Sequence, residues 1–222
     1  MIPRYVAVIA NRSTKAMATE VTIGMRPRAW VAAAVAVTAL VGVQRSAAGQ
    51  HLVEVRLADT EYRYVDCNST WAPGAVVDVF YVGVPGSNEL NAGGGYAIRR
   101  GRLTLTPLVY AVAGKEDSQR GVKVALLASF ERGGWKLLGF LADYIPGSGA
   151  VDAYQVLDTL DVTRTVGTRW EAGVQSGFFH TGGAWNPQVG PLVKLNDRVG
   201  AWAVSYRFGP QPEFRVGRVL IF

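Results

Sequence analysis

Residues 120–132, RGVKVALLASFER, indicate the fold class. Every second residue from Val122 to Phe130 is apolar, and the alternate positions, from Lys123 to Glu131, include Lys123, Ser129 and Glu131. Successive side chains of a β-strand point to opposite faces, so an alternation with a period of two separates these two sets. The stretch therefore predicts a strand with one apolar face and one partly polar face.

The same alternation recurs along the chain, and no apolar stripe of helical period follows residue 72. Ten segments are candidate strands, near residues 75–84, 90–98, 102–113, 120–132, 135–145, 153–165, 168–180, 188–196, 199–208 and 213–222. Most of them are nine to thirteen residues long. Strands of globular proteins average about five or six residues, whereas a tilted strand that crosses a bilayer needs about 9 to 11. The length therefore favours a membrane wall over a soluble sandwich.

The connections between these segments alternate in length. Tight links are expected at 99–101, 133–134, 166–167 and 197–198, and longer ones at 85–89, 114–119, 146–152, 182–187 and 209–212. Antiparallel barrels of the outer membrane have short periplasmic turns and longer outer loops. We therefore predict an all-β, closed, antiparallel up-and-down transmembrane β-barrel of about ten strands, with both of its ends on the periplasmic side.

Residues 49–72 are less clear than the predicted barrel, residues 73–222. Residues 51–57 alternate, and residues 62–65 form a second short candidate strand. If both join the wall, the barrel has twelve strands. We prefer ten, with residues 49–72 as a periplasmic extension or a partial plug.

Aromatic residues agree with this phasing of the strands. Trp135, Trp170 and Trp202 each follow a tight link, whereas a second set lies near the longer loops: Tyr144, Tyr154, Phe178, Phe179 and Phe208. Amphipathic rings prefer the headgroup level of a membrane. The two sets are therefore expected to form aromatic girdles at the inner and outer interfaces.

The last nine residues, FRVGRVLIF, resemble the closing strand of bacterial outer-membrane β-barrels, which ends in an aromatic residue preceded by alternating apolar residues. Phe222, Leu220, Val216 and Phe214 match this pattern, and Arg218 departs from it. The resemblance implies that Phe222 belongs to an assembly signal read by the machinery that folds barrels into the outer membrane. It covers residues 73–222 as a pattern and points to the porin-like barrels without identifying a member.

A barrel of this kind needs closure, because lipid offers no hydrogen-bond partner to a free strand edge. Apolar side chains then face the acyl chains, and the polar set lines the lumen: Lys123, Glu131, Asp161, Glu171, Gln175, Lys194 and Arg207. About eight strands enclose only their own side chains, so ten leave a narrow conduit at most. Buried charges persist only when paired, so we expect ion pairs inside.

The net charge comes from the N-terminal part of the chain. The 222 residues hold 23 Lys plus Arg and 17 Asp plus Glu; residues 1–48 hold six of the bases and one of the acids, which leaves 17 and 16. A nucleic-acid binder is not supported by this balance. Cys67, the single cysteine, excludes an internal disulfide and a thiolate zinc cluster.

Residues 25–48 read as a signal peptide. Arg26 and Arg28 precede an apolar run of 15 residues, and Ser46 and Ala48 are the small residues that a signal peptidase needs. The run is shorter than the ~20 residues of a membrane-spanning helix, although an uncleaved anchor is the alternative. We predict cleavage after Ala48, and residues 1–24 as an upstream start assigned in error.

His180, at the predicted outer rim, is the one candidate catalytic residue. The lipid A deacylases show His-x-Ser where this chain has His180-Thr181-Gly182, and the Asp-x-His element of the omptin proteases is absent. Thr181 and Ser176 are the nearby hydroxyls, and no orienting acid can be placed. A polar rim residue is the preferred interpretation.

No metal site or cofactor is expected. Asp158 and Asp161 lie three positions apart on a strand and so point to opposite faces; Asp158 falls on the apolar side, which places it near a rim or at a bulge because an acid facing lipid is costly. Residues 93–95, GGG, lack the Lys-Ser/Thr ending of a phosphate loop.

Three functions follow from these observations. The first is an integral outer-membrane barrel of a Gram-negative bacterium with a structural, adhesion-type or narrow porin-like role. The second is a lipid-modifying or proteolytic barrel that uses His180, and the third is a secreted lipocalin-like binder. The expected partners of the first are outer-membrane lipid, lipopolysaccharide and the barrel-assembly machinery.

Overall fold

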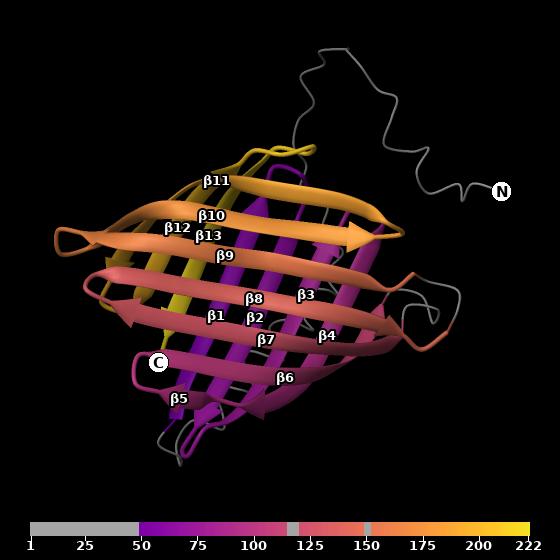
Figure 1. Ribbon diagram of the computed structural model, residues 1–222, viewed down its shortest axis with the longest axis horizontal. Helices are drawn as coiled ribbons and strands as arrows, with labels where there is room; N and C mark the ends of the chain where they lie inside the picture. Colours follow the sequence, from indigo (N-terminus) through magenta and orange to yellow (C-terminus); the bar gives the residue numbers. More distant parts are fainter. Residues whose placement is uncertain (1–48, 115–119, 149–151) are drawn as a thin grey trace, which may run out of the picture. The chain divides into compact units, whose positions relative to one another are not determined.

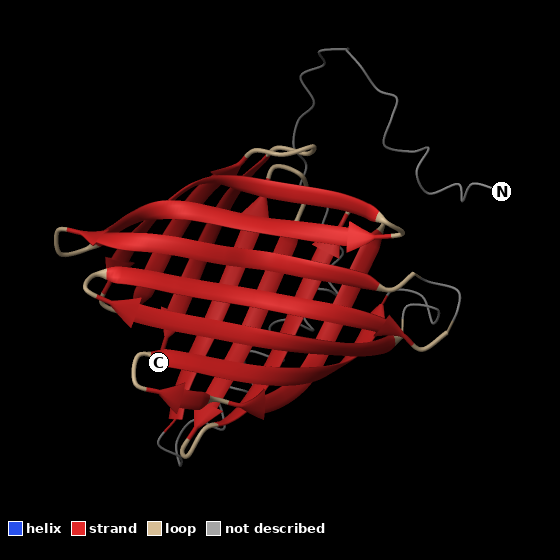
Figure 2. Ribbon diagram, in the orientation of Figure 1, coloured by secondary structure: helices blue, strands red, loops and turns tan. Residues whose placement is uncertain are grey.

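The computed structural model describes residues 49–114, 120–148 and 152–222. The predicted upstream segment and signal peptide lie outside these residues. Thirteen strands are present: β1 (Gly49–Ala58), β2 (Arg63–Trp71), β3 (Ala75–Val84), β4 (Ser87–Tyr96), β5 (Ile98–Arg100), β6 (Leu103–Gly114), β7 (Gly121–Arg132), β8 (Trp135–Pro146), β9 (Tyr154–Val166), β10 (Trp170–Thr181), β11 (Ala184–Asp197), β12 (Gly200–Arg207) and β13 (Glu213–Ile221). The described residues contain no helix that is long and apolar enough to cross a membrane (Figure 2).

The strands form one closed antiparallel barrel. Consecutive strands pair with each other except β4 and β5; β4 pairs instead with β6, and β1 pairs with β13. The three-residue β5 pairs with β6 beside the end of β4, so the wall has twelve strands and one short addition. In Figure 1, β6 to β11 cross in front of β1 to β4, β12 and β13.

The preferred count of ten strands is therefore wrong, and the alternative of twelve is the one observed. Residues 49–72 are neither a periplasmic extension nor a plug, because β1 and β2 belong to the wall and β1 closes it against β13. The alternation in β2 is weak. The positions that share a face with Val65 include Cys67 and Ser69, which are small rather than strongly apolar.

The two ends of the barrel carry different connections. One end, here called the turn end, holds Phe222 and the links 72–74, 101–102, 133–134, 167–169 and 198–199. The other, here called the loop end, holds the links 59–62, 85–86, 182–183 and 208–212, together with the last residues of β6 and β8 and the first residues of β7 and β9. Two of the expected long loops, 85–89 and 182–187, are two-residue turns. Gly182 and Gly183 have φ angles of 56° and 80°, the positive values that a type I′ hairpin turn requires.

The outer face of the wall is apolar and the inner face is largely polar. Many large apolar side chains are exposed, among them Val109 at 55%, Val124 at 47% and Trp202 at 49%. The buried polar set includes Asp78, Lys123, Asp161, Glu171, Gln175, Ser205, Arg207 and Arg215. A soluble lipocalin-like barrel would have the opposite arrangement, so that alternative is not favoured. Lipid contact explains the exposed apolar face.

Candidate functional site: the lumen of the barrel

The lumen contains a cavity of about 490 Å³ in its turn-end half, here called the inner cavity. Charged side chains of both signs line it, together with small residues of β12 and β13. The charged residues are Glu54, Arg56, Arg102, Glu131, Lys136, Asp161, Glu171, Lys194 and Arg215. A cavity of this size with charged groups in its wall has room for water molecules.

Ion pairs hold most of these charges against the wall of the inner cavity. Lys194 Nζ lies 2.7 Å from Asp161 Oδ2, and Lys136 Nζ lies 2.6 Å from Glu171 Oε1. Gln175 Nε2 donates to Asp161 Oδ1 at 2.9 Å. Each of the two ion pairs joins strands that have one strand between them, whereas Gln175 and Asp161 lie on adjacent strands. The pairs therefore neutralise charge along the wall without crossing the lumen.

A second group of charges crosses the lumen. Asp158 accepts from Arg56 Nη1 through Oδ2, and Arg215 Nη1 lies 3.2 Å from Asp158 Oδ1. Arg56 also forms two hydrogen bonds of 2.7 Å with Glu54. Arg215 is paired with Glu213, and Arg207 Nη2 lies 2.6 Å from Glu213 Oε1. These six residues are called the arginine–aspartate cluster below.

A β-bulge aims Asp158 into the lumen. In the pairing with β8, Phe140 faces Thr159 and Leu141 faces Leu157, which leaves Asp158 as the extra residue. The pairing with β10 shifts at the same point. Bulges re-aim side chains in this way. Of the two sequence-based placements, near a rim or at a bulge, the structure has the bulge.

The backbone around the bulge also binds the cluster. Arg207 Nη1 donates to the carbonyl oxygen of Asp158 at 3.1 Å. Gly177 lies opposite, and a Cβ there would come within 2.6 Å of the Leu157 carbonyl oxygen and 3.1 Å of Arg207 Nη1. The glycine therefore leaves the space through which the guanidinium of Arg207 reaches the bulge.

Aromatic side chains fill the part of the lumen beyond the cluster. The guanidinium of Arg215 lies 4.1 Å from the ring centroid of Tyr62, and that of Arg56 lies 4.5 Å from the centroid of Tyr64. These two rings belong to a buried aromatic cluster of Tyr62, Tyr64, Phe80, Tyr110 and Phe140. The inner cavity is thus separated from the loop end by a charged layer and an apolar layer.

A third polar group lies toward the loop end. Lys123 Nζ is 2.9 Å from Glu89 Oε2, and Tyr154 Oη is 2.7 Å from both oxygens of the same carboxylate. Tyr144 stacks on Tyr154 with their centroids 4.8 Å apart. Glu89 therefore links β4 to β7 and β9. This group lies on the side of the aromatic cluster that faces away from the arginine–aspartate cluster.

The residues predicted to line the lumen occupy these groups. Lys123, Asp161, Glu171, Gln175 and Arg207 are buried inside the barrel. Lys194 is paired with Asp161 inside the cavity. Glu131 is exposed near the turn end, opposite Lys136 in the register of β7 and β8, and lines the cavity.

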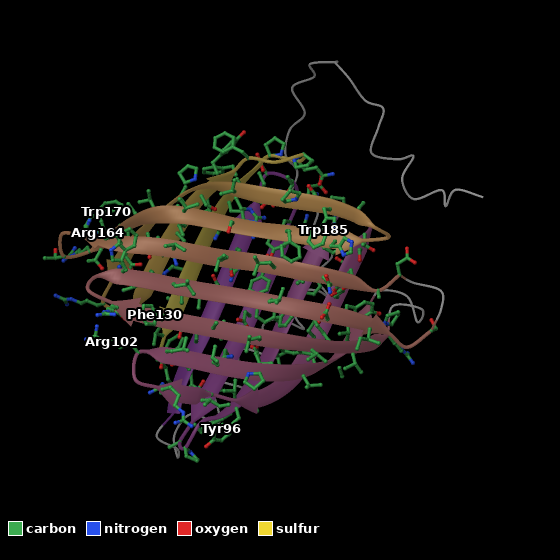
Figure 3. All side chains as sticks on the ribbon, in the orientation of Figure 1. Tyr96, Arg102, Phe130, Arg164, Trp170 and Trp185 are labelled. Atoms are coloured by element: carbon green, nitrogen blue, oxygen red, sulfur yellow. The ribbon has the colours of Figure 1, made fainter. Side chains whose placement is uncertain are left out.

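Several predicted girdle residues lie on the outer face. Trp135, Trp170 and Trp202 are about half exposed beside turns of the turn end (50%, 51% and 49%), and Trp170 and Arg164 appear there together in Figure 3. The guanidinium of Arg164 lies 5.7 Å from the Trp135 ring centroid. Positively charged tips beside interfacial rings are typical of membrane proteins.

The outer set was partly wrong. Tyr144 is 2% exposed, and Tyr154 binds Glu89, so both rings lie inside. The position of these two residues along their strands predicts a place near the interface, but it does not say which face of the wall they occupy. That face follows from the alternation, since Tyr144 pairs with the inward Lys123. Phe179 packs on Tyr154. The outward rings near the loop end include Phe178 and Phe208. They also include Trp185, labelled in Figure 3, which was not predicted because its segment was expected to be a loop.

The C-terminal strand shows why Arg218 departs from the apolar pattern. In the pairing with β12, Phe214, Val216 and Arg218 face Tyr206, Val204 and Trp202 in turn, which places all of them on the outer face. Arg218 Nη1 lies 2.7 Å from Asp197 Oδ2, at the turn end. The side chain therefore reaches the edge of the wall. Phe222 pairs with His51 through its backbone.

His180 has no catalytic surroundings among the described residues. Its ring stacks on Trp185, with centroids 4.2 Å apart. Ser176 Oγ contacts the carbonyl oxygen of Leu160, and Thr181 Oγ1 that of Ala153, so neither hydroxyl is hydrogen-bonded to the imidazole. The structure does not support the hydrolase interpretation, and it favours a rim residue.

Comparison with known proteins gives the fold alone. No family model and no curated protein matches the chain. Among solved structures, it resembles a KdgM porin (TM-score 0.59, 12% identity, covering 78% of this chain and 99% of that one) and a NanC porin (TM-score 0.54, 9% identity, 78% and 99%). A KdgM porin in complex with disordered oligogalacturonate has a TM-score of 0.60 at 12% identity, with the same coverage. The chain therefore has the fold of porin β-barrels.

Proposed function

We propose that this chain is a narrow, porin-like channel of the outer membrane of a Gram-negative bacterium. The observation that carries the proposal is the charged inner cavity of about 490 Å³ inside a closed wall with an apolar exterior. An adhesion-type or structural role needs no such cavity. The signal peptide, the surrounding lipopolysaccharide and the barrel-assembly machinery belong to the same proposal.

The expected conductance is small. Eight strands are filled by side chains, and porins of about 16 to 18 strands leave an open aqueous channel. Twelve strands lie between these limits, and here the arginine–aspartate cluster and the aromatic cluster occupy the loop-end half. Inorganic ions and very small solutes are the expected permeants.

The lumen does not favour a polyanion. One of the similar porins was solved with oligogalacturonate, but most inner cations of this chain are paired with acids: Lys123 with Glu89, Lys136 with Glu171, Lys194 with Asp161, and Arg56 with Glu54. A polyanion would have to displace these carboxylates. We therefore do not extend that ligand to this chain.

Planar bilayers test the proposal. Protein that shifts its gel mobility on boiling, as folded barrels do, is added to a bilayer in 1 M KCl, a concentration of about 3 Å Debye length at which long-range surface charge is screened. Discrete low-conductance steps are expected. Folded protein that remains silent in many insertions would refute the channel and favour a structural barrel, consistent with the filled loop-end half.

A further inference from the structure

We propose that Asp158 is the residue that closes this lumen and sets its ion selectivity. The inference rests on the proposed channel function and names the device that regulates it. No motif marks this residue in the sequence, because its role depends on the bulge and on partners in distant strands.

Asp158 connects opposite sides of the barrel. Between β9, which carries Asp158, and β1, which carries Arg56, lie four strands in one direction around the wall and six in the other. Their ion pair therefore spans the lumen almost along a diameter. Arg215 reaches the same carboxylate from β13, at 3.2 Å. The carboxylate is thus held from the far wall by two guanidinium groups.

The cluster forms the boundary of the inner cavity. Glu54, Arg56 and Arg215 line the cavity, whereas Asp158 does not. Beyond it, Tyr62 Oη donates to Asp158 Oδ1 at 3.3 Å, and the Tyr62 ring packs against Arg215. An ion that moves from the cavity toward the loop end must pass this layer. Breaking the link between the walls would therefore widen the path.

The charge balance of the cluster predicts the selectivity. Arg56, Arg207 and Arg215 carry three positive charges, and Glu54, Asp158 and Glu213 carry three negative ones, so the cluster is neutral. Replacing Asp158 by Asn leaves a net charge of +1, and replacing Arg56 by Gln leaves −1. Rings of charged side chains select ions of opposite sign, so the two variants should shift selectivity in opposite directions.

Single-channel recording of refolded full-length protein tests this inference. D158N should raise the conductance roughly twofold or more over wild type, and under a KCl gradient its reversal potential should move toward the chloride equilibrium potential. R56Q should also conduct more, with a shift toward the potassium potential. D158E keeps the carboxylate, so its conductance and reversal potential should lie closer to the wild-type values than those of D158N. Asp143, which is exposed on the outer face, provides the control D143N with the same loss of charge.

The outcomes separate the inference from the proposed function. If wild type conducts and folded D158N has the same conductance and reversal potential, the inference is wrong and the channel stands. If wild type is silent and D158N conducts, the proposed open channel is wrong for wild type, and the closing role of Asp158 is supported. If all folded variants are silent, both are wrong. Should D158N not fold, R56Q breaks the same link from the other wall, and a folded R56Q indistinguishable from wild type overturns the inference.

Discussion

An arginine in the centre of the outer face tests whether this wall faces lipid. Leu126 lies in the middle of β7, is 39% exposed, and pairs with Pro107 of β6 and Leu141 of β8. An arginine at the midplane of a membrane barrel costs about 2–4 kcal/mol. On a wall that faced water, an exposed substitution would stay within about 0.5 kcal/mol. We therefore expect L126R to lower the free energy of unfolding by about 2–4 kcal/mol.

Leu103 provides the matched control. It is the first residue of β6, is 36% exposed, and pairs with outward Phe130 near the turn end, where the same substitution costs about 0–1 kcal/mol. Both variants are refolded into phosphatidylcholine vesicles, and unfolding by guanidinium chloride is followed by tryptophan fluorescence. Equal losses for L126R and L103R, or no loss for L126R, would refute the assignment of this face to hydrocarbon.

Three further outcomes are expected. Y154F should destabilise the refolded barrel by about 1.5–3 kcal/mol, because it removes a hydrogen bond to the carboxylate of Glu89. Y144F should leave the stability unchanged, since the Tyr144 hydroxyl is buried without a partner among the described residues. The same denaturant titration compares the two variants, and an equal loss of stability would contradict the hydrogen bond between Tyr154 and Glu89. H180A should leave conductance and folding unchanged, and loss of a measured lipid or peptide hydrolysis in this variant would restore the enzyme interpretation. Mass spectrometry of the protein purified from membranes should place the mature N-terminus directly after Ala48, within a few residues; an intact leader contradicts cleavage.

Sequence periodicity predicted the wall well because lipid imposes a strong pattern on it. The outward positions of β7, from Val122 to Phe130, are apolar without exception, so parity alone identified the lumen-facing Lys123. In β2 the alternation was too weak to predict a strand of the wall, because small residues such as Cys67 and Ser69 take outward positions. Hairpin length was misjudged at Gly182-Gly183, although the pair itself is a turn signal.

The arginine–aspartate cluster could not be predicted from the sequence. Asp158 falls on the apolar side of a regular β9, and only the bulge reverses its direction. Its partners Arg56 and Arg215 lie in β1 and β13, and they come near only when the wall closes. Local periodicity reports on which face a side chain lies, but it carries no information about which side chains meet across the lumen.

The seam between β1 and β13 also constrains how this protein can be made. The backbone of His51 exchanges hydrogen bonds of 3.2 and 2.9 Å with that of Phe222, so the first and last strands of the described chain are partners. Without β13, both β1 and β12 have an unpaired edge, so the wall cannot close until β13 is in place. Because the start of β1 and the end of β13 adjoin, linking these two strands and opening a hairpin elsewhere would give a circular permutant that keeps all the strand pairings of the wall.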